Sequence, residues 1–470
     1  MPDILELSAG EQAARIAAGG LSAGALMAAT LARIDAVNGR LNAIVGLRDA
    51  DLLLAEARAV DRDRPRGALA GIPVAIKDLA DARGLPTSQG SPLFAGQMAE
   101  RDDPHVARLR AAGAIVLGKT NTPEFGLGSH TYNPVHGVTR NPYAADRSCG
   151  GSSGGAAVAL AAGMLGIADG SDMMGSLRNP AGWCNVYGMR PSWGRVPGAG
   201  VGDLYLHQLS TNGPMARCPA DLALMLDVMA GPVTDQPLSV DFPPCGPPRA
   251  RAAGRRIAWL GDWGGAWPCE AGILALCESA LGVLEAQGAM VEPVVAPFDR
   301  DALWRAWTTL RSWSIAARLG PLLDDPATRD RLKPAAVWEI ERGRGLSGLE
   351  VDAASRIRSD WFRRAVALFQ THDAIALPTA QVWPFPIELD WPREIAGQAM
   401  DSYHRWMEVT IPASLIGLPA LAMPAGFGAA GLPMGVQIIG PRGGDATLLE
   451  IACAYHRATG WPQARPPVVS

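Results

Sequence analysis

The sequence predicts an α/β fold with a central β-sheet covered by helices on both faces. Short apolar runs that suit buried strands alternate with longer segments of helical periodicity, and this alternation places helices on the faces of a sheet. The 470 residues are 48% hydrophobic and 19% charged, which is the balance of a globular protein with a large core. No linker, charge block or repeat divides the chain, so we expect a single domain of residues 1–470.

The helices are predicted from apolar residues that recur every three or four positions. Ser22 is a typical N-cap for the helix that begins after it, and Gly113 is a typical C-terminal stop. The predicted helical segments are residues 8–37 with a cap at 21–22, 52–60, 104–112, 154–164, 219–229, 270–287, 301–319, 349–370 and 447–459.

The strands are predicted from short apolar runs that glycine, proline or polar residues interrupt. The run that ends just before Lys77 and Asp78 suits a short buried strand. The Pro/Gly-rich residues 232–254 suit a long surface excursion rather than a domain linker. The predicted strands are residues 72–76, 114–117, 165–169, 256–260, 289–294, 374–377 and 436–439.

Charge and cysteine content exclude several classes of protein. The net charge of −4 gives no reason to expect nucleic acid or an anionic membrane as a partner. Seven cysteines without C-x-x-C spacing predict neither a zinc nor a redox site, and no disulfides in a reducing compartment. The N-terminal residues lack the basic and apolar regions of a secretory signal. The most apolar stretch, residues 156–168, is shorter than the roughly 20 residues that span a membrane. We therefore expect a cytoplasmic protein.

The lysine content is low. Three of the 42 basic residues are lysines, namely Lys77, Lys119 and Lys333. Arginine fills surface positions equally well but stays charged, so it cannot replace lysine where a group must lose its proton. A lysine at the end of an apolar run therefore suits a chemical role, because burial lowers the pKa of an amine toward values at which it can act as a base.

Two matches to common motifs fail on their structural context. Residues 113–120 fit the pattern G-x-x-x-x-G-K-[ST], but the residues between the glycines suit a strand interior, whereas a phosphate-binding loop needs small flexible residues there. Residues 150–154 fit the pattern G-x-S-x-G, but no buried strand precedes them and no later histidine lies in a setting typical of a base. The sequence therefore predicts neither a nucleotide site nor an α/β-hydrolase nucleophile.

Two serines can approach each other although they lie far apart in the sequence. The helix after Ser152 and the strand after that helix carry the chain out and back, which returns Ser176 to the neighbourhood of Ser152. The turn at residues 173–176 can aim successive backbone N–H groups at one point, as an oxyanion requires. Because a neutral lysine can activate a serine, Lys77, Ser152 and Ser176 form a candidate catalytic group.

Several motifs in a fixed order resemble the amidase signature family of serine amidases. The matching motifs are residues 71–78, 118–126, 150–155, 172–180, 188–196 and 212–217 with Asp221, followed by weaker matches at residues 417–420 and 431–437. The resemblance implies the amidase signature fold, in which a mixed central sheet is covered by helices on both faces. It also implies a signature core at about residues 69–221 and a variable, substrate-shaping region at about residues 232–410.

The resemblance implies a catalytic role for each residue of the candidate group. Ser176 becomes the nucleophile, and Lys77 becomes the base. Ser152 becomes the bridging serine, preceded by a cis peptide bond, and Ser153 becomes a supporting residue.

The resemblance also implies roles for the residues around the nucleophile. Asp172 and Arg178 brace the Ser176 loop by charge-assisted hydrogen bonds. Gly128 and Ser129, with residues 120–121, line the acyl site. The oxyanion is held by the backbone N–H groups of Met173, Met174, Gly175 and Ser176.

Three positions depart from the family pattern. Leu177 stands where the family carries isoleucine, which is a mild change. Met174 stands where the family carries a glycine, so the backbone there must be one that a residue with a Cβ can adopt. Residues 412–414 stand where many members carry an asparagine, which changes the expected pocket.

We expect hydrolysis of a carboxylic amide C–N bond through an acyl-enzyme on a serine. Trp304, Trp307 and Trp313 on one amphipathic segment favour small aryl or apolar amides, with carbamates and hydrazides left open. The expected partner is a small-molecule amide, no metal or cofactor is implied, and a homodimer is left open. Two alternatives remain: an amidotransferase-type subunit that releases ammonia from glutamine for a partner protein, and a non-catalytic relative, which Met174 makes conceivable.

Overall fold

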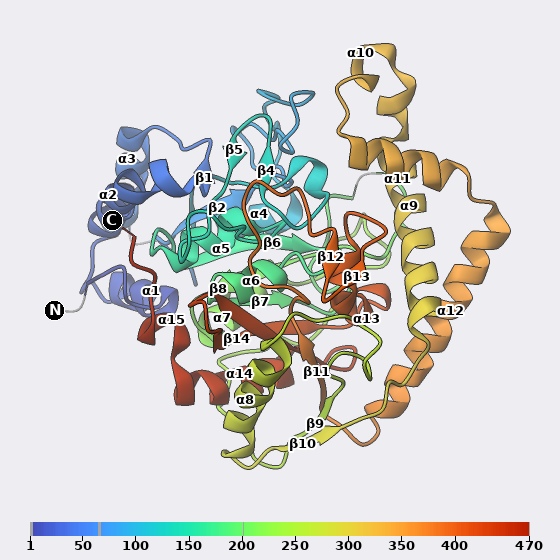
Figure 1. Ribbon diagram of the computed structural model, residues 1–470. Coiled ribbons are helices and arrows are strands. Elements are labelled where there is room, and N and C mark those ends of the chain that lie inside the picture. Colours follow the sequence, from blue (N-terminus) through green and yellow to red (C-terminus); the bar gives the residue numbers. More distant parts are fainter. Residues whose placement is uncertain (1–2, 64–66, 201, 470) are drawn as a thin grey trace.

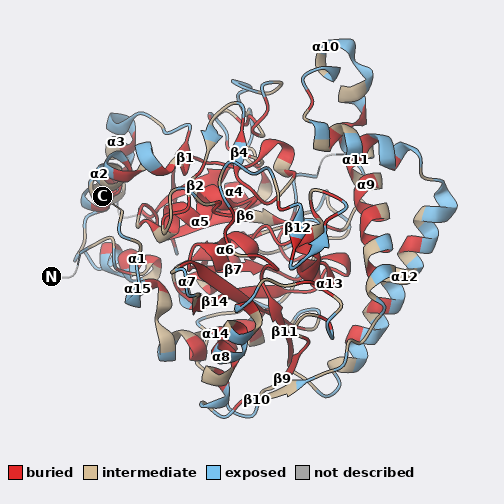
Figure 2. Ribbon diagram, in the orientation of Figure 1, coloured by how far each residue is buried: buried red, intermediate tan, exposed pale blue. Residues whose placement is uncertain are grey.

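The computed structural model describes residues 3–63, 67–200 and 202–469. An eight-stranded sheet occupies the centre of the molecule, with helices on both of its faces (Figure 1). Buried residues follow the strands of this sheet and the helix surfaces that face it (Figure 2). The α/β prediction is therefore confirmed. Residues 1, 2 and 470, at the ends of the expected single domain, lie outside the described residues. Residues 1 and 2 also belong to the N-terminal segment in which we expect no secretory signal.

The central sheet is mixed. Its strands are β6 (Ile167–Asp172), β7 (Tyr187–Arg190), β8 (Thr211–Ala216), β9 (Arg256–Trp259), β10 (Met290–Pro293), β11 (Ala374–Pro378), β14 (Ala420–Phe427) and β15 (Pro433–Ile439). The strand order is β10-β9-β11-β15-β14-β7-β8-β6, so β6 lies at one edge. The strand β9 pairs in parallel with β10 and β11, and the remaining pairs are antiparallel.

A smaller sheet lies beside this edge. It consists of β1 (Ile44–Val45), β3 (Ile115–Thr120) and β2 (Pro73–Lys77), with β2 parallel and β1 antiparallel to β3. The strand β2 packs beside β6, and the backbone N–H of Lys77 donates to Asp169 Oδ1 at 2.7 Å. The predicted strands at residues 72–76 and 114–117 therefore form, but they belong to this second sheet, which a side-chain hydrogen bond connects to the first.

Helices cover both faces of the central sheet. The helices α5 (Gly154–Ala161) and α6 (Asn179–Trp183) pack against one face, and α7 (Pro219–Met229), α8 (Ile273–Glu285) and α14 (Asp445–Thr459) pack against the other. Ser22 caps the second N-terminal helix as predicted, because its side chain accepts the N–H of Ala25. The remaining N- and C-terminal helices are α1 (Ala9–Ala17), α2 (Ala23–Leu41), α3 (Ala50–Asp63), α4 (Pro104–Ala111) and α15 (Trp461–Ala464).

A helical flank covers the right side of the molecule in Figure 1. It is formed by α9 (Arg300–Asp324), α10 (Pro326–Arg329), α11 (Pro334–Arg344) and α12 (Gly348–Leu368). The helix α9 packs against α11, α12 and α13 (Ile411–Leu415). The two predicted amphipathic helices, at residues 301–319 and 349–370, are therefore present, although α9 continues to Asp324. The sequence analysis predicts no helix at α11.

Three strands of the central sheet, β7, β8 and β14, are not predicted from the sequence. Each contains a glycine or proline, which weakens a local strand pattern. Gly188 of β7 lies so close to the nucleophile segment that a Cβ there would be 1.9 Å from Leu177 O. Pro424 lies next to a shift in the register of β14 with β15. Packing against distant segments, rather than local propensity, therefore decides these strands.

Short hairpins and 3-10 turns complete the chain. The hairpins are β4 (Tyr132–Asn133) with β5 (Gly137–Val138) and β12 (Glu394–Ile395) with β13 (Gln398–Ala399), and the turns are η1 (Glu124–Gly126) and η2 (Arg405–Thr410). In the described part of the chain, no helix combines the length and apolar character that crossing a membrane requires. All seven cysteines are described, and all are free thiols.

The crossing of α9 and α11 gives a prediction about stability. A Cβ at Gly343 of α11 would lie 2.1 Å from Ser312 O of α9, so Gly343→Ala forces the helices apart and should lower the free energy of unfolding by about 1–3 kcal/mol. Gly282 of α8 has no heavy atom within 4 Å of such a Cβ, so Gly282→Ala should stabilise by about 0.5–1 kcal/mol. Urea unfolding followed by circular dichroism measures both. Shifts of the same sign in the two variants contradict the packing described.

Candidate active site

The side chain of Lys77 lies at the centre of a buried cluster of serines. The apolar strand β2 carries it into the interior, where it is 1% exposed. Its Nζ lies 2.8 Å from Ser152 Oγ, 2.9 Å from Ser153 Oγ and 3.1 Å from Ser171 Oγ. Lys77 therefore contacts Ser152, the predicted bridging serine, and Ser153, the predicted supporting residue. It also contacts Ser171, which the sequence analysis does not single out.

Burial controls the charge of this lysine. The loss of water around Nζ lowers the pKa of Lys77 to about 7, against the opposing charges of Asp169 and Asp172. No carboxylate in the described part of the chain comes within ion-pair distance of Nζ. The amine therefore loses its proton far more readily than a lysine in water, and in its neutral form it can accept a proton from a hydroxyl.

Two of the three serines that contact Lys77, Ser152 and Ser153, precede helix α5. The peptide bond between Gly151 and Ser152 is cis. Glycine is required at the start of α5, because a Cβ at Gly155 would lie 2.3 Å from the backbone nitrogen of Asn121. The backbone N–H of Ser153 donates to Ser176 O at 3.2 Å. This hydrogen bond places the Ser176 turn beside the residues that contact Lys77.

Ser176 lies in a tight turn after β6. Gly175 has a φ of 81°, and a Cβ there would also lie 2.6 Å from Thr410 Cγ2, so this position requires glycine. The φ of Met174 lies outside the left-handed region, so the backbone there is one that a residue with a Cβ can adopt. Ser176 is 6% exposed. Within the described residues its hydroxyl makes no hydrogen bond, so it is not hydrogen-bonded to the Ser152 hydroxyl.

The predicted oxyanion donors differ in their availability. The backbone N–H of Gly175 donates to Asp172 Oδ1 at 3.0 Å, so it is already occupied. The N–H groups of Met173, Met174 and Ser176 donate to no acceptor among the residues that the structure describes. Three of the four predicted donors therefore remain available.

Asp172 and Arg178 hydrogen-bond to each other, and Asp172 accepts backbone N–H groups of the turn. Arg178 forms a bidentate pair with Asp172 at 3.0 Å for both bonds, and Arg190 also contacts this carboxylate at 3.3 Å. All three side chains are 0% exposed. Burial works to raise the pKa of Asp172, but the two guanidinium groups outweigh it and hold that pKa well below its usual value. The turn is therefore fixed by a buried carboxylate that carries a full negative charge.

Distant segments complete this brace, and the sequence analysis does not identify them. Arg178 also donates to Ser414 Oγ at 2.7 Å, to Gln437 Oε1 at 2.5 Å and to Thr410 O at 3.1 Å. Ser414, which lies in the segment where many members of the family carry an asparagine, thus accepts a hydrogen bond from the arginine of the brace. In the sequence, the only sign that Ser414 is important is that residues 412–414 depart from the family pattern.

The residues predicted to line the acyl site fall into two groups. Gly128 is partly exposed, and a Cβ there would lie 4.0 Å from the Tyr403 ring, while Ser129 is 3% exposed. Thr120 and Asn121 are fully buried, and Asn121 hydrogen-bonds within the protein to Thr139 and Asn133. Of the four, Gly128 is thus the most accessible.

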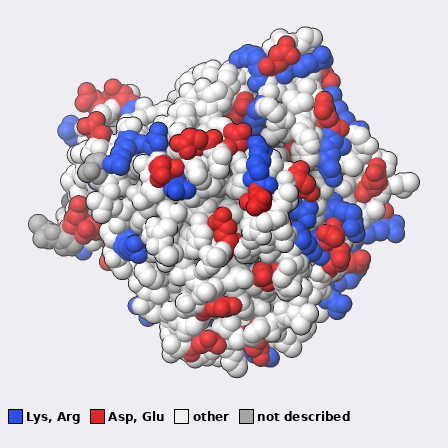
Figure 3. Space-filling model, in the orientation of Figure 1, with Lys and Arg blue, Asp and Glu red and all other residues white. Residues whose placement is uncertain are grey.

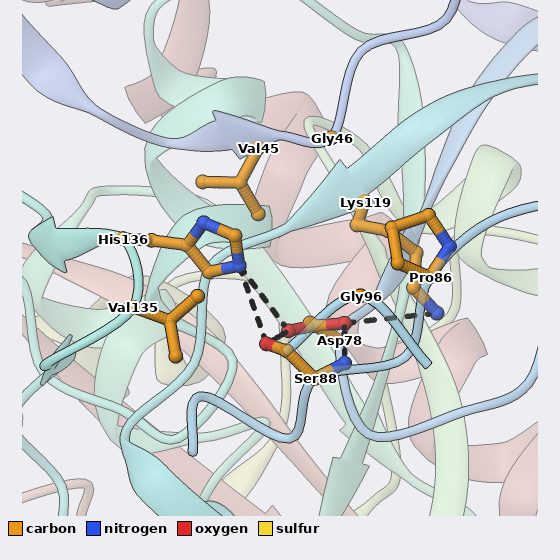
Figure 4. Close-up of a pocket in the computed structure, with 9 residues that line it drawn as sticks. All are labelled: Val45, Gly46, Asp78, Pro86, Ser88, Gly96, Lys119, Val135 and His136. Carbon is orange, nitrogen blue, oxygen red and sulfur yellow. Dashed lines mark hydrogen bonds and ion pairs between the residues drawn. The ribbon is translucent and has the colours of Figure 1, made fainter. Parts of the chain in front are cut away.

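A second cluster of polar residues surrounds a small cavity (Figure 4). One of the residues that line it is Asp78, which follows Lys77 in the sequence. The cavity measures about 50 Å³, room for a few water molecules. Ser88 donates to Asp78, and His136 Nε2 lies 3.3 Å from Ser88 Oγ and 3.6 Å from Asp78 Oδ2. A serine–histidine–aspartate triad uses opposite ring nitrogens for the serine and the carboxylate. Here one nitrogen faces both, so these residues do not form such a triad.

The described residues contain no group of three or more histidine, cysteine or acidic side chains that could hold a metal ion. The chemistry that the lysine and the serines offer is acid–base and nucleophilic. A buried neutral amine can take a proton from one hydroxyl, and a second hydroxyl lies next to free backbone donors.

Comparison with known proteins identifies the family. The model of the Amidase family matches residues 25–449, so the chain belongs to the amidase signature family, whose members are hydrolases that act on amides. It is 33% identical to an acylamidase of Rhodococcus erythropolis over 98% of this chain and 97% of that protein. It is 37% identical to a glutamyl-tRNA(Gln) amidotransferase subunit of Thermus thermophilus over 97% of this chain and 98% of that one. The crystal structure of a bacterial aryl acylamidase superposes with a TM-score of 0.91 at 28% identity, covering 98% of this chain and 99% of that one.

The buried brace gives a prediction about stability. Asp172→Asn leaves two buried arginines without their countercharge, so it should lower the free energy of unfolding by about 3–5 kcal/mol. Because the folded-state pKa of Asp172 is depressed, its contribution is present above the unfolded carboxyl pKa near 4 and is lost as pH falls through the folded pKa. Urea unfolding between pH 7 and pH 3 measures both effects.

Asp146→Asn is the matched control for this experiment. Asp146 forms an exposed pair with Arg147 at 3.6 Å, so its loss should change stability by less than about 1 kcal/mol. Equal effects of the two substitutions contradict the bracing role of Asp172.

Proposed function

We propose that this chain hydrolyses the C–N bond of small aryl or apolar amides through an acyl-enzyme on Ser176. The observation that carries the proposal is the buried Lys77 amine, 2.8 Å from Ser152 Oγ, beside a turn that presents Ser176 and free backbone donors. A lysine whose pKa lies near 7 matches the working range of a general base.

The proposed reaction begins with proton transfer. Neutral Lys77 accepts a proton from Ser152, which accepts one from Ser176, and Ser176 Oγ attacks the amide carbonyl. Catalytic hydrogen bonds are often long before substrate binds, so the lack of a hydrogen bond between the two serine hydroxyls in the described structure is compatible with this relay. The oxyanion receives hydrogen bonds from the N–H groups of residues 173, 174 and 176. The relay then returns a proton to the leaving amine, and water hydrolyses the acyl-enzyme.

Apolar surroundings support an aryl or apolar acyl group. Met173, next to the nucleophile turn, is partly exposed and packs against the main hydrophobic core. A second apolar cluster lies between η1 and the helices α9 and α11, and it includes Phe125, Leu127, Ile315 and Tyr403. The acylamidase and the aryl acylamidase among the similar proteins support the same substrate class. Carbamates and hydrazides present a comparable carbonyl and belong in the same test.

The three tryptophans that we expected to favour aryl or apolar substrates make contacts within the protein. Trp307 is 0% exposed, and Trp313 packs on His207 with ring centroids 4.6 Å apart. Trp304 packs under the guanidinium of Arg405, with 4.3 Å between the guanidinium carbon and the ring centroid. These contacts are internal packing, and Phe125, Leu127 and Ile315 of the apolar cluster are buried as well. The substrate class therefore rests mainly on the likeness to the two acylamidases.

An amidotransferase-type subunit is the second candidate. The 37% identity to the Thermus thermophilus amidotransferase chain favours it, and it requires glutamine as substrate and a partner protein. On the face in Figure 3, acidic and basic side chains intermix, most densely over α9 and α12, where several of them form ion pairs. On that face, this pattern supports a small-molecule substrate rather than direct binding of nucleic acid. The homodimer and the cytoplasmic location stay predictions.

Removal of the nucleophile tests the proposal. Ser176→Ala should lower kcat/KM for an anilide by roughly 10³-fold or more, and mass spectrometry of the intact protein should show an acyl or fluorophosphonate adduct on the parent chain and none on this variant. Ser279→Ala, on the exposed side of α8, is the control and should keep both activity and adduct. An adduct on Ser176→Ala rejects the assignment. Glutaminase activity that appears only with a co-purifying partner supports the amidotransferase alternative.

The pKa of Lys77 predicts the pH dependence of activity. Only the neutral amine accepts a proton, so kcat/KM should rise with pH, reach half its maximum near pH 7 and fall about tenfold per pH unit below that. Lys77→Ala should lose several orders of magnitude, and Lys77→Arg should not restore activity because arginine stays charged. A flat profile from pH 5 to pH 8, or an active Lys77→Arg variant, refutes the base assignment.

A further inference from the structure

Three cations from the helical flank face the loops that carry the candidate active site. Arg311 and Arg318 lie about two turns apart on α9, with Ile315 between them, so all three residues share one face of the helix. Lys333 is the N-cap residue of α11. We call Arg311, Arg318 and Lys333 the cationic group.

Each member of the cationic group contacts a loop next to the serines. Arg318 Nη2 donates to Phe125 O at 3.2 Å, and Lys333 Nζ donates to Leu127 O at 2.7 Å. Between these two carbonyls lies Gly126, where a Cβ would be 3.7 Å from Ser152 Oγ. The cations therefore lie directly behind the short loop that passes the bridging serine.

Arg311 contacts the other loop. Its Nη1 lies 3.2 Å from Met173 Sδ, a weak acceptor, in the turn that holds Ser176. Its remaining donors form a buried pair with Glu339 at 2.7 Å and a hydrogen bond with Tyr403 Oη at 2.6 Å. Arg311 therefore has its countercharge within the protein.

Arg318 and Lys333 lack such a countercharge. Neither forms an ion pair within the described residues, and each makes one hydrogen bond, to a backbone carbonyl. Glu124 and Asp390 act on Lys333 only from beyond ion-pair distance. A guanidinium offers five N–H donors, so Arg318 keeps most of its donors unused.

The surroundings make these two charges costly. Burial lowers the pKa of Arg318 to about 10, and the like charge of Arg311 adds to the effect. Burial likewise lowers the pKa of Lys333 to about 8. Both side chains nevertheless keep surface that solvent reaches, Arg318 more than Lys333. Arg318 is an exposed residue and Lys333 is half-buried, so a small anion can reach both charges and pair with the unused N–H donors of Arg318.

We infer that Arg318 and Lys333 bind a carboxylate of the substrate, so that the preferred amides are apolar or aryl amides that also carry a carboxylate. This inference rests on the proposed amide hydrolysis at Ser176. A planar guanidinium pairs with a carboxylate through two parallel hydrogen bonds, and the nearby lysine adds a second charge. The apolar cluster between η1 and α9 receives the hydrocarbon part. The carboxylate belongs either to the acyl side or to the amine side of the scissile bond.

Three matched substrates separate these cases. Butyranilide is neutral, N-phenylsuccinamic acid carries the carboxylate on the acyl side, and 4-butyramidobenzoic acid carries it on the amine side. We expect one of the two charged amides to exceed butyranilide in kcat/KM by about tenfold or more, chiefly through a lower KM. This preference should shrink as salt rises, because ions screen the attraction. A parent enzyme that hydrolyses butyranilide but prefers neither acid overturns the inference.

Arg318→Gln should remove about tenfold of this preference, measured as the ratio of kcat/KM for the preferred acid to kcat/KM for butyranilide, and Lys333→Gln should act in the same direction. Arg305→Gln, on an exposed position of the same helix, is the control and should leave the preference unchanged. If Arg318 and Lys333 only hold the loop carbonyls, the variants lower the rates of all three amides equally, and the inference fails. If no amide is hydrolysed and no adduct forms on Ser176, the proposed function itself fails.

Discussion

The desolvation of the Lys77 amine is the constraint on which the rest of this site depends. An ammonium group in a dry interior requires a carboxylate, and the structure instead surrounds Nζ with the hydroxyls of Ser152, Ser153 and Ser171. Hydroxyls can donate to a neutral amine as well as accept from a charged one, so they tolerate both states. The cluster therefore keeps the amine solvated by protein while leaving it free to lose its proton.

The buried ion pairs of Asp172 with Arg178 and Arg190 help to keep the Lys77 amine able to lose its proton. Asp169 and Asp172 both favour the charged form of Lys77, and an uncompensated carboxylate at Asp172 would hold the lysine protonated. Two guanidinium groups, those of Arg178 and Arg190, neutralise Asp172. The same carboxylate fixes the backbone of the turn through the N–H groups of Gly175 and Leu177. One buried network thus sets both the position of the turn and the electrostatic background of the base.

The sequence predicts the parts of the site that local patterns encode. An apolar run that ends in a lysine, a glycine-rich loop before a helix, and a turn after a strand are all contiguous, and they locate Lys77, Ser152 and Ser176. Their roles come from the family motifs. Arg190, Ser414 and Gln437 reach the site only because strands far apart in the chain pair in the central sheet, and no local pattern records those contacts. The same reason hides β7 and β8, where close approach of backbone from another segment requires Gly188 and Gly213 against strand propensity. It also hides β14, where proline and glycine interrupt the local strand pattern.

The scarcity of lysine gives a sharper lesson about what composition can predict. All three lysines have pKa values lowered chiefly by burial, so in this arginine-rich chain lysine marks sites that protein atoms surround. Burial alone does not mark catalysis, however. Lys119 is 1% exposed, and it donates to Ala80 O and Thr87 Oγ1 near Asp78, so it holds a loop in place. Lys77 differs because most of its partners are hydroxyls that can give up a proton, whereas a carbonyl cannot. The chemistry of the partners, and not the burial of the amine, therefore distinguishes a candidate base from a structural lysine.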